Sequence, residues 1–195
     1  LYGCEIYNIG MEALHFRDGS SNNIAENLNI HDTGKQTPDY GEGVYVGSDQ
    51  SKWSTYKKEC DYNTVKNSTI GPGVTAEHVD IKEGTTGTVI EGCTFKGTGI
   101  SGANYADSFI DVKGNNASIR NNVGYRENNS KIVDAFQLHQ QVSGWGLNNY
   151  FIGNTVYLDI STPYVINAAS GTSAFASNNT RNPAGNMYKG NVTVL

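Results

Sequence analysis

The 195-residue sequence has few charged residues, four prolines and no long apolar run. Charged residues make up 17% of the chain, which excludes a charge-rich disordered protein and a long coiled coil. Because no run of 18 apolar residues occurs, we expect no transmembrane helix and no membrane partner. The 14 basic residues form no cluster and the net charge is −5, so nucleic acid is not an expected partner.

Cysteine is also scarce, with only Cys4, Cys60 and Cys93. This odd number fits neither a metal-ligand spacing nor a disulfide scaffold. Cys4 and Cys93 fall three coils apart in the repeat described below, too far for a disulfide, so both are interpreted as small buried fillers. Glycine and asparagine are abundant instead, with 23 of each. This composition disfavours helices and favours a chain that turns often.

Two series of short segments recur along the chain. The first alternates apolar and other residues with starts 26 to 35 residues apart, which predicts strands with one buried face. Its members are Leu14–Arg17, Val44–Gly47, Val79–Lys82, Ile110–Lys113, Phe136–His139 and Tyr164–Asn167. The second carries glycine or asparagine at a bend before an apolar residue. Its members are Gly3–Ile6, Asn27–Ile30, Asn67–Ile70, Gly92–Phe95, Asn121–Gly124, Gly153–Val156 and Gly190–Thr193.

These repeats predict an all-β fold, a right-handed parallel β-helix of about six to seven coils that covers residues 1–195 as one domain. The second series places Asn122, Asn154 and Asn191 in one column, which predicts a stacked asparagine ladder. The rival fold, a sandwich of antiparallel hairpins, would require tight turns every 8 to 12 residues or so. The coil that begins at Leu1 lacks its first strand, so we expect a trimmed or processed N-terminus. We also expect preceding residues or a partner chain to cover the first coil.

The outward residues of the first series form two columns on one face of the helix. One column contains His15, Tyr45, Asp80, Asp111 and Gln137. The next contains Arg17, Gly47, Lys82, Lys113 and His139. Acids that precede each strand are expected at a bend beside these columns, at Glu12, Glu42, Glu77 and Asp134.

Two interpretations of this face remain open. Cross-strand ion pairs on a solvated sheet would explain the alternation of acids and bases. However, Asp80 is expected to lie beside Asp111, and Lys82 beside Lys113, in adjacent coils about 5 Å apart. Like charges so close together require neutralisation by a bound ion or ligand. Bound Ca²⁺ would neutralise the acids, with Glu77, Asp80, Asp107 and Asp111 as its ligands. A polyanionic substrate would neutralise Arg17, Lys82 and Lys113.

The segment Asp107–Lys113 resembles the D-x-x-x-D-x-K segment of pectate lyases, and most of the chain resembles the pectin-lyase-like superfamily of right-handed parallel β-helix proteins. The resemblance implies that Asp107 and Asp111 bind Ca²⁺ together with an acid of the preceding coil, and that Lys113 contacts a uronate. The R-x-P-x-x-R motif of pectate lyases is absent. In relatives that use a lysine base, the implied base is Lys82 or Lys113.

The resulting hypothesis is a secreted lyase that cleaves an acidic, uronate-containing polysaccharide by β-elimination. Lys113 or Lys82 would take the C5 proton, and His139 or water would protonate the leaving oxygen. Calcium, or Arg17 with the second lysine, would bind the carboxylate. Outer-column residues would contact the substrate, namely Arg17, His15, Tyr45 and Gln137.

Two other functions remain as alternatives. A non-catalytic carbohydrate-binding or structural module would use the same face, with its many aromatic residues as sugar platforms. A glycoside hydrolase would use Asp80 with Asp111, or Glu77 with Asp107, as its two carboxylates. It ranks third, because the Asp-Asp pair and Gly-His of polygalacturonases are absent. The long loop from Ser48 to Tyr62 is either a solvated excursion or a wall of the groove.

Overall fold

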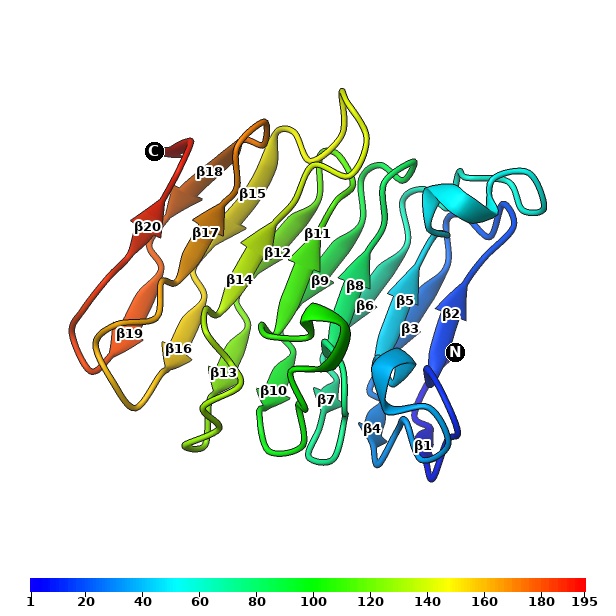
Figure 1. The fold of residues 1–195 in the computed structure, drawn as a ribbon, viewed down its shortest axis with the longest axis horizontal. Coiled ribbons are helices and arrows are strands. Elements are labelled where there is room, and N and C mark those ends of the chain that lie inside the picture. Colours follow the sequence, from blue (N-terminus) through cyan, green and yellow to red (C-terminus); the bar gives the residue numbers. More distant parts are fainter.

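The computed structural model describes residues 1–195 as a parallel β-helix of seven coils. Each coil contributes one strand to each of three parallel sheets, and the coils lie side by side along the long axis in Figure 1. We call the sheets I, II and III, in the order in which the chain passes through them from β2 onward. No helix combines the length and apolar character that a membrane span requires.

Sheet I contains the six segments of the first repeat series and a seventh strand that the series missed. Its strands are β2 (Leu14–Phe16), β5 (Val44–Val46), β8 (Val79–Ile81), β11 (Ile110–Val112), β14 (Phe136–Leu138), β17 (Ile166–Ala168) and β20 (Tyr188–Lys189). The sixth segment, Tyr164–Asn167, is two residues out of the predicted register, because Phe136 pairs with Ile166 and not with Tyr164. Sheet III contains the strands of the first six segments of the second series and a seventh strand that the series missed. Its strands are β1 (Glu5–Tyr7), β4 (Asn29–His31), β7 (Thr69–Ile70), β10 (Thr94–Lys96), β13 (Val123–Tyr125), β16 (Thr155–Tyr157) and β19 (Thr180–Asn182).

Sheet II lies between them along the chain. Its strands are β3 (Ile24–Glu26), β6 (Thr64–Lys66), β9 (Val89–Glu91), β12 (Ser118–Arg120), β15 (Asn149–Ile152), β18 (Ala174–Ser177) and β21 (Val192–Val194). Three short 3₁₀ turns interrupt the loops, and we label them η1 (Pro38–Tyr40), η2 (Gln50–Lys52) and η3 (Ala103–Tyr105).

The parallel β-helix predicted from the repeats is confirmed. Each coil has three strands, whereas the two repeat series predicted only two. A strand of sheet II ends only two residues before the strand of sheet III begins, as Val89–Glu91 and Thr94–Lys96 show. The bend residues between them adopt left-handed backbone, with φ of 55° at Asn27 and 62° at Gly92. The segments of the second series begin at these bend residues, so the short strand that precedes each bend was not predicted.

The last member of the second series was assigned to the wrong sheet. Gly190–Thr193 leads into β21, which pairs with β18 in sheet II. The asparagine ladder therefore runs through Asn122, Asn154 and Asn179, and Asn191 lies outside it. Each amide of the ladder bonds to the next across coils, at 3.0 Å for Asn122 Nδ2 to Asn154 Oδ1 and 2.9 Å for Asn154 Nδ2 to Asn179 Oδ1.

The interior of the helix is one hydrophobic core of 33 buried residues shared by all coils. Alternation along each strand of sheet I points the flanking apolar residues inward, such as Val44 and Val46, and the central residue outward. Phenylalanines supply the largest buried side chains, among them Phe95 and Phe109. All three cysteines are unpaired; Cys60 and Cys93 are buried, whereas Cys4, which was interpreted as a buried filler, is only partly buried against the core.

Candidate active site

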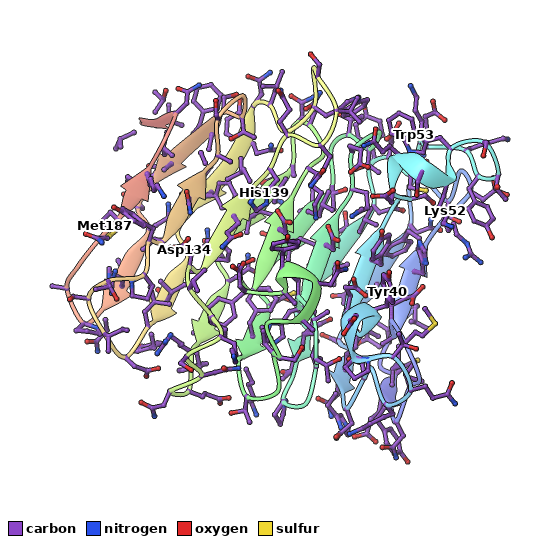
Figure 2. All side chains as sticks on the ribbon, viewed as in Figure 1. Tyr40, Lys52, Trp53, Asp134, His139 and Met187 are labelled. Carbon is purple, nitrogen blue, oxygen red and sulfur yellow. The ribbon has the colours of Figure 1, made fainter.

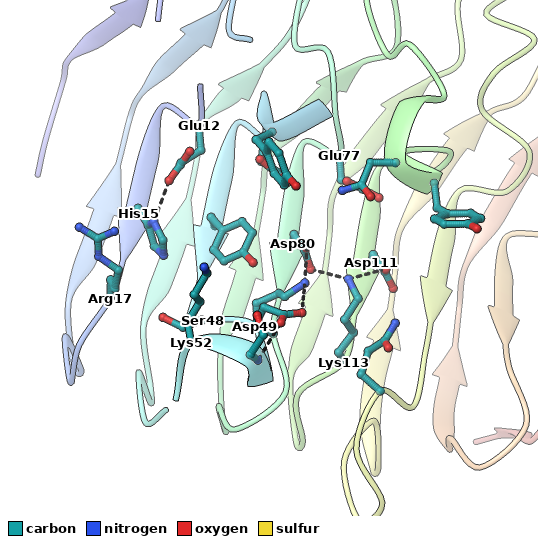
Figure 3. A pocket seen from close by; sticks show the side chains of 18 of the residues that line it. Glu12, His15, Arg17, Ser48, Asp49, Lys52, Glu77, Asp80, Asp111 and Lys113 are labelled. Carbon is teal, nitrogen blue, oxygen red and sulfur yellow. Dashed lines mark hydrogen bonds and ion pairs between the residues drawn. The ribbon is translucent and has the colours of Figure 1, made fainter. Parts of the chain in front are cut away.

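A groove of about 1030 Å³ runs over the outer face of sheet I (Figure 3). The loop that contains η2 forms one wall of it, with Asp49, Lys52 and Tyr56 facing the groove. The predicted acids Glu12, Glu42 and Glu77 also line it. All eleven predicted site residues lie in this one groove: His15, Arg17, Tyr45, Glu77, Asp80, Lys82, Asp107, Asp111, Lys113, Gln137 and His139.

Strand register places the central residues of successive coils directly beside one another. Tyr45 is paired with Asp80, Asp80 with Asp111, and Asp111 with Gln137. The two Asp-x-Lys segments of adjacent coils therefore lie side by side on the outer wall, as the sequence predicted. The floor of the groove is a column of polar side chains that are almost fully buried.

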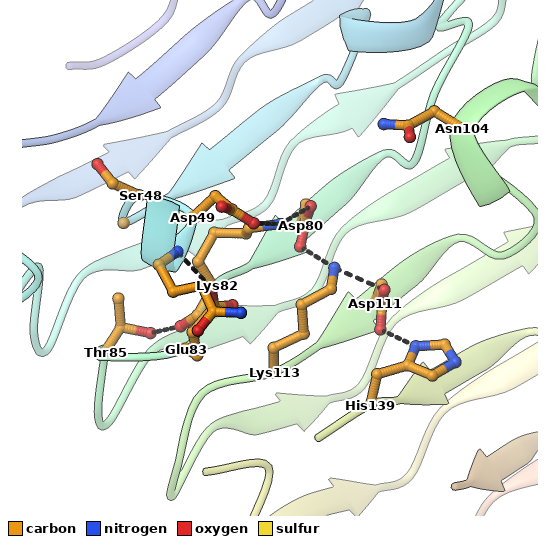
Figure 4. A network of polar contacts seen from close by, with 12 residues as sticks. Ser48, Asp49, Asp80, Lys82, Glu83, Thr85, Asn104, Asp111, Lys113 and His139 are labelled. Atoms are coloured by element: carbon orange, nitrogen blue, oxygen red, sulfur yellow. Dashed lines mark hydrogen bonds and ion pairs between the residues drawn. The ribbon is translucent and has the colours of Figure 1, made fainter. Parts of the chain in front are cut away.

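The two lysines of this floor are inserted among its carboxylates (Figure 4). Lys113 Nζ lies 2.8 Å from Asp80 Oδ1 and 2.6 Å from Asp111 Oδ2. Lys82 Nζ lies 3.2 Å from Asp80 Oδ2 and 4.0 Å from Asp49 Oδ2. The ion pairs of the solvated-sheet interpretation are thus present, but they are buried. Buried ion pairs are a poor source of stability, because desolvation opposes the attraction.

The charge state of Lys113 follows from these contacts. Burial alone would lower the pKa of Lys113, but Asp111, Asp80 and Glu77 outweigh it and hold this pKa well above its usual value. Burial likewise works to raise the pKa of Asp111, and Lys113 and His139 reverse the effect and lower it. The Lys113 ammonium and the Asp111 carboxylate are therefore both charged across the neutral pH range.

Two possible proton donors flank this pair. Burial, with a further contribution from the charge of Asp80, raises the pKa of the Tyr45 phenol well above its usual value, so the hydroxyl keeps its proton. Lys82 Nζ lies 5.3 Å from the centre of the Tyr45 ring. On the other side, His139 Nδ1 lies 2.8 Å from Asp111 Oδ1, and this hydrogen bond raises the pKa of His139.

At the first coils the groove presents a cation without a carboxylate partner. Arg17 stacks its guanidinium 4.5 Å from the centre of the Tyr56 ring and makes no ion pair. His15 bonds through Nδ1 to Glu12 Oε1 at 2.9 Å, and its Nε2 lies 2.8 Å from Gly47 O. Arg17 is therefore free to contact an anionic ligand.

Three carboxylates of the groove lie close enough to hold one metal ion. Oxygens of Glu42, Glu77 and Asp80 all fall within 4.8 Å of one another. Two of the four predicted ligands belong to this cluster, whereas Asp111 is engaged by Lys113 and His139, and Asp107 lines the groove outside the cluster. Burial, followed by the charge of Asp80, raises the pKa of Glu42 to about 7, and the same two causes raise that of Glu77. Burial also raises the pKa of Asp107 to about 6.

Several lining residues were not assigned a role from the sequence. Glu42 stood in the predicted column of acids, and its position before a strand of sheet I was the available signal. Asn104 and Tyr105 lie on η3, in an irregular segment between sheets III and I, where no repeat pattern marks them. Their approach to the groove depends on the conformation of that segment.

The fold and the groove define a parallel β-helix protein with a floor of paired lysines and carboxylates. The sequence matches no protein-family model and no curated protein. Among solved structures, the chain is similar to the crystal structure of an alginate lyase from Paenibacillus sp. str. FPU-7, with 62% sequence identity and a TM-score of 0.96. The match covers 97% of this chain, which spans about 63% of the length of that lyase.

Proposed function

We propose that the chain forms the catalytic β-helix of a lyase that cleaves alginate, or a closely related polyuronate, by β-elimination. The observation that carries this proposal is the 62% identity to an alginate lyase over 97% of this chain, which bears a groove with two lysines in its floor. We also propose the calcium ligands, the roles of the individual residues and an extracellular location.

β-Elimination requires a base, stabilisation of charge on the uronate carboxylate, and an acid for the leaving oxygen. The base removes the proton from C5, the released electron pair forms the C4–C5 double bond, and the C4–O bond breaks. We assign the charge-stabilising role to Lys113, because its two carboxylate partners keep it protonated. We assign the base to Lys82, which has only one close carboxylate contact.

Tyr45 and His139 both remain candidates for the acid. The Tyr45 phenol keeps its proton and lies beside Lys82. His139 lies beyond Asp111 at the edge of the floor, with its side chain 39% exposed. If Tyr45 is the donor, Tyr45→Phe should lower kcat more than a hundredfold, whereas His139→Gln should lower it only severalfold. The reverse order would assign the donor to His139.

The cluster of Glu42, Glu77 and Asp80 fits a hard divalent cation such as Ca²⁺, because all its donors are carboxylate oxygens. Glu42 Oε2 is buried without a hydrogen-bond partner, which leaves a donor free for an ion. A bound Ca²⁺ would add positive charge beside the uronate carboxylate. Isothermal titration of the chelator-treated protein with Ca²⁺ should show one site that Glu42→Gln removes. An absence of heat in the unmodified protein would refute the calcium assignment.

We further propose that the protein acts outside the cell, since its substrate would be an extracellular polymer. Comparison of lyase activity in the culture medium and in washed cells of the source organism tests this location. Activity confined to the cells would contradict it.

The activity itself is tested by incubating the protein with alginate and, separately, with polygalacturonate. Elimination should produce one ultraviolet-absorbing unsaturated end for each new reducing end on alginate. Reducing ends without ultraviolet absorbance would indicate a hydrolase instead. Binding without either product would indicate a non-catalytic module.

A further inference from the structure

Tyr105 is an unusual residue on the wall of the groove. It is 88% exposed, the highest value among the large apolar and aromatic residues of the chain. Its backbone is left-handed, with φ of 65°, and that of the preceding Asn104 is left-handed too, with φ of 50°. Left-handed backbone costs about 1–2 kcal/mol for a residue other than glycine, and asparagine tolerates it better than tyrosine. Because the ring is exposed, packing within the protein does not repay this cost.

The turn that carries Tyr105 is fixed by hydrogen bonds to the coils on both sides of it. Ser101 donates from both its backbone N–H and its hydroxyl to Thr75 O, each at 2.9 Å. Asn129 Nδ2 donates to Ile100 O at 2.9 Å, and Ala106 N–H closes the turn on Ala103 O at 2.9 Å. The protein therefore holds the tyrosine at the groove in a strained conformation, and strained residues cluster at active sites and ligand-binding positions.

A second tyrosine stands beside it on the same wall. Tyr40 at the end of η1, labelled in Figure 2, is 49% exposed and lines the groove, and η1 packs beside η3. Asn104 links the two turns through a 3.5 Å contact from its Nδ2 to Asp39 O, and Figure 4 shows it projecting from η3. The wall thus presents aromatic rings, whereas the floor below presents Lys82 and Lys113.

We propose that Tyr105 binds substrate by stacking its ring against a pyranose ring of the polyuronate, and that it sets affinity rather than rate. The inference rests on the proposed function for the class of ligand. A pyranose has apolar C–H faces and a polar edge, and tyrosine combines an apolar ring face with a polar tip. A uronate whose face lies on the aromatic wall can direct its carboxylate edge to the lysines of the floor.

The test compares Tyr105→Asn with Tyr105→Phe. Asparagine fits the left-handed backbone but lacks the ring, so the Tm should stay equal or rise by about 2–4 °C. The KM for alginate should rise about three- to tenfold, the size of one lost aromatic contact, with kcat within about twofold. Tyr105→Phe should keep the original KM. A residue with a merely structural role would lower the Tm and would not produce this split between KM and kcat.

Tyr62 provides a matched control. It is also exposed, at 61%, with left-handed backbone at φ of 56°, but it lies outside the groove. Tyr62→Asn should leave the KM unchanged. An unchanged KM in Tyr105→Asn, or an equal rise in Tyr62→Asn, would overturn the proposal.

Calorimetry with alginate oligosaccharides separates this inference from the proposed activity. If the protein binds them without cleaving them and Tyr105→Asn weakens the binding, the stacking role stands and the lyase proposal fails. If the unmodified protein does not bind them, the stacking role is refuted.

Discussion

Removing Asn154 from the centre of the asparagine ladder should strongly destabilise the β-helix. Asn154 is fully buried and its side-chain amide makes four hydrogen bonds to the two neighbouring coils. Its Oδ1 accepts from the backbone N–H and the Nδ2 of Asn122, each at 3.0 Å. Its Nδ2 donates to Ile119 O at 2.8 Å and to Asn179 Oδ1 at 2.9 Å.

Alanine at this position leaves the buried N–H of Asn122 without a partner and removes three further hydrogen bonds. An unpaired buried donor costs about 1–3 kcal/mol and each of the three other lost bonds about 1 kcal/mol, so Asn154→Ala should reduce the free energy of unfolding by about 4–6 kcal/mol. Asn191→Ala is the control, because Asn191 is exposed and its side chain makes a single hydrogen bond, of 3.3 Å, to Thr172 O. Its cost should be about 0.5–1 kcal/mol.

Urea denaturation followed by circular dichroism measures both values, and equal m-values would show that the unfolded states are comparable. If Asn154→Ala costs no more than Asn191→Ala, the ladder contributes little and this reasoning about buried amides is refuted.

Three further predictions concern buried charges. His78 is fully buried, and burial lowers its pKa from 6.5 to about 4. The unfolded state therefore binds a proton at higher pH than the folded state, and the free energy of unfolding should fall by about 3 kcal/mol as the pH falls from 6.5 to 4. Denaturant midpoints of His78→Gln should lack this fall, and a pH profile identical to that of the unmodified protein would contradict the prediction. Glu42 acts in the opposite sense, because burial raises its pKa from 4.5 to about 7, so the free energy of unfolding falls as the pH rises between these values. Relative to the unmodified protein, Glu42→Gln should gain about 3 kcal/mol of stability as the pH rises from 4.5 to 7. No gain would place Glu42 in a more hydrated environment. Lys113→Met leaves Asp80 and Asp111 buried without the ammonium that they share, so thermal unfolding should show a loss of about 3–5 kcal/mol in stability. Unchanged stability would mean that water reaches the two carboxylates.

Much of the groove was predictable because it lies on the most regular part of the chain. In sheet I a buried apolar residue precedes and follows each outward residue, so the alternation fixes which side chains face out. Register then follows from stacking like segments, and Asp80 beside Asp111 needed no further information. The same reasoning placed Lys82 and Lys113 in one groove with His139 and Arg17.

The parts that escaped prediction depend on irregular backbone or on burial. The strands of sheet II were missed, because they end at the two-residue bend at which each segment of the second repeat series was taken to begin. Tyr105 reaches the groove through a turn with two left-handed residues, which no periodicity encodes. The sequence allowed either lysine to act as base, and only the two close carboxylates around Lys113 distinguish it from Lys82.

The central claim is that Lys82 removes the C5 proton of a uronate in this groove. The most direct measurement is the rate of ultraviolet-absorbing product formation from alginate by the unmodified protein, by Lys82→Ala and by Lys96→Ala, a control lysine on sheet III outside the groove. We predict product from the unmodified protein and from Lys96→Ala, and a loss of at least a hundredfold in Lys82→Ala with its fold intact. Comparable product formation by Lys82→Ala would contradict the assignment of the base, and no product from the unmodified protein would contradict the lyase itself.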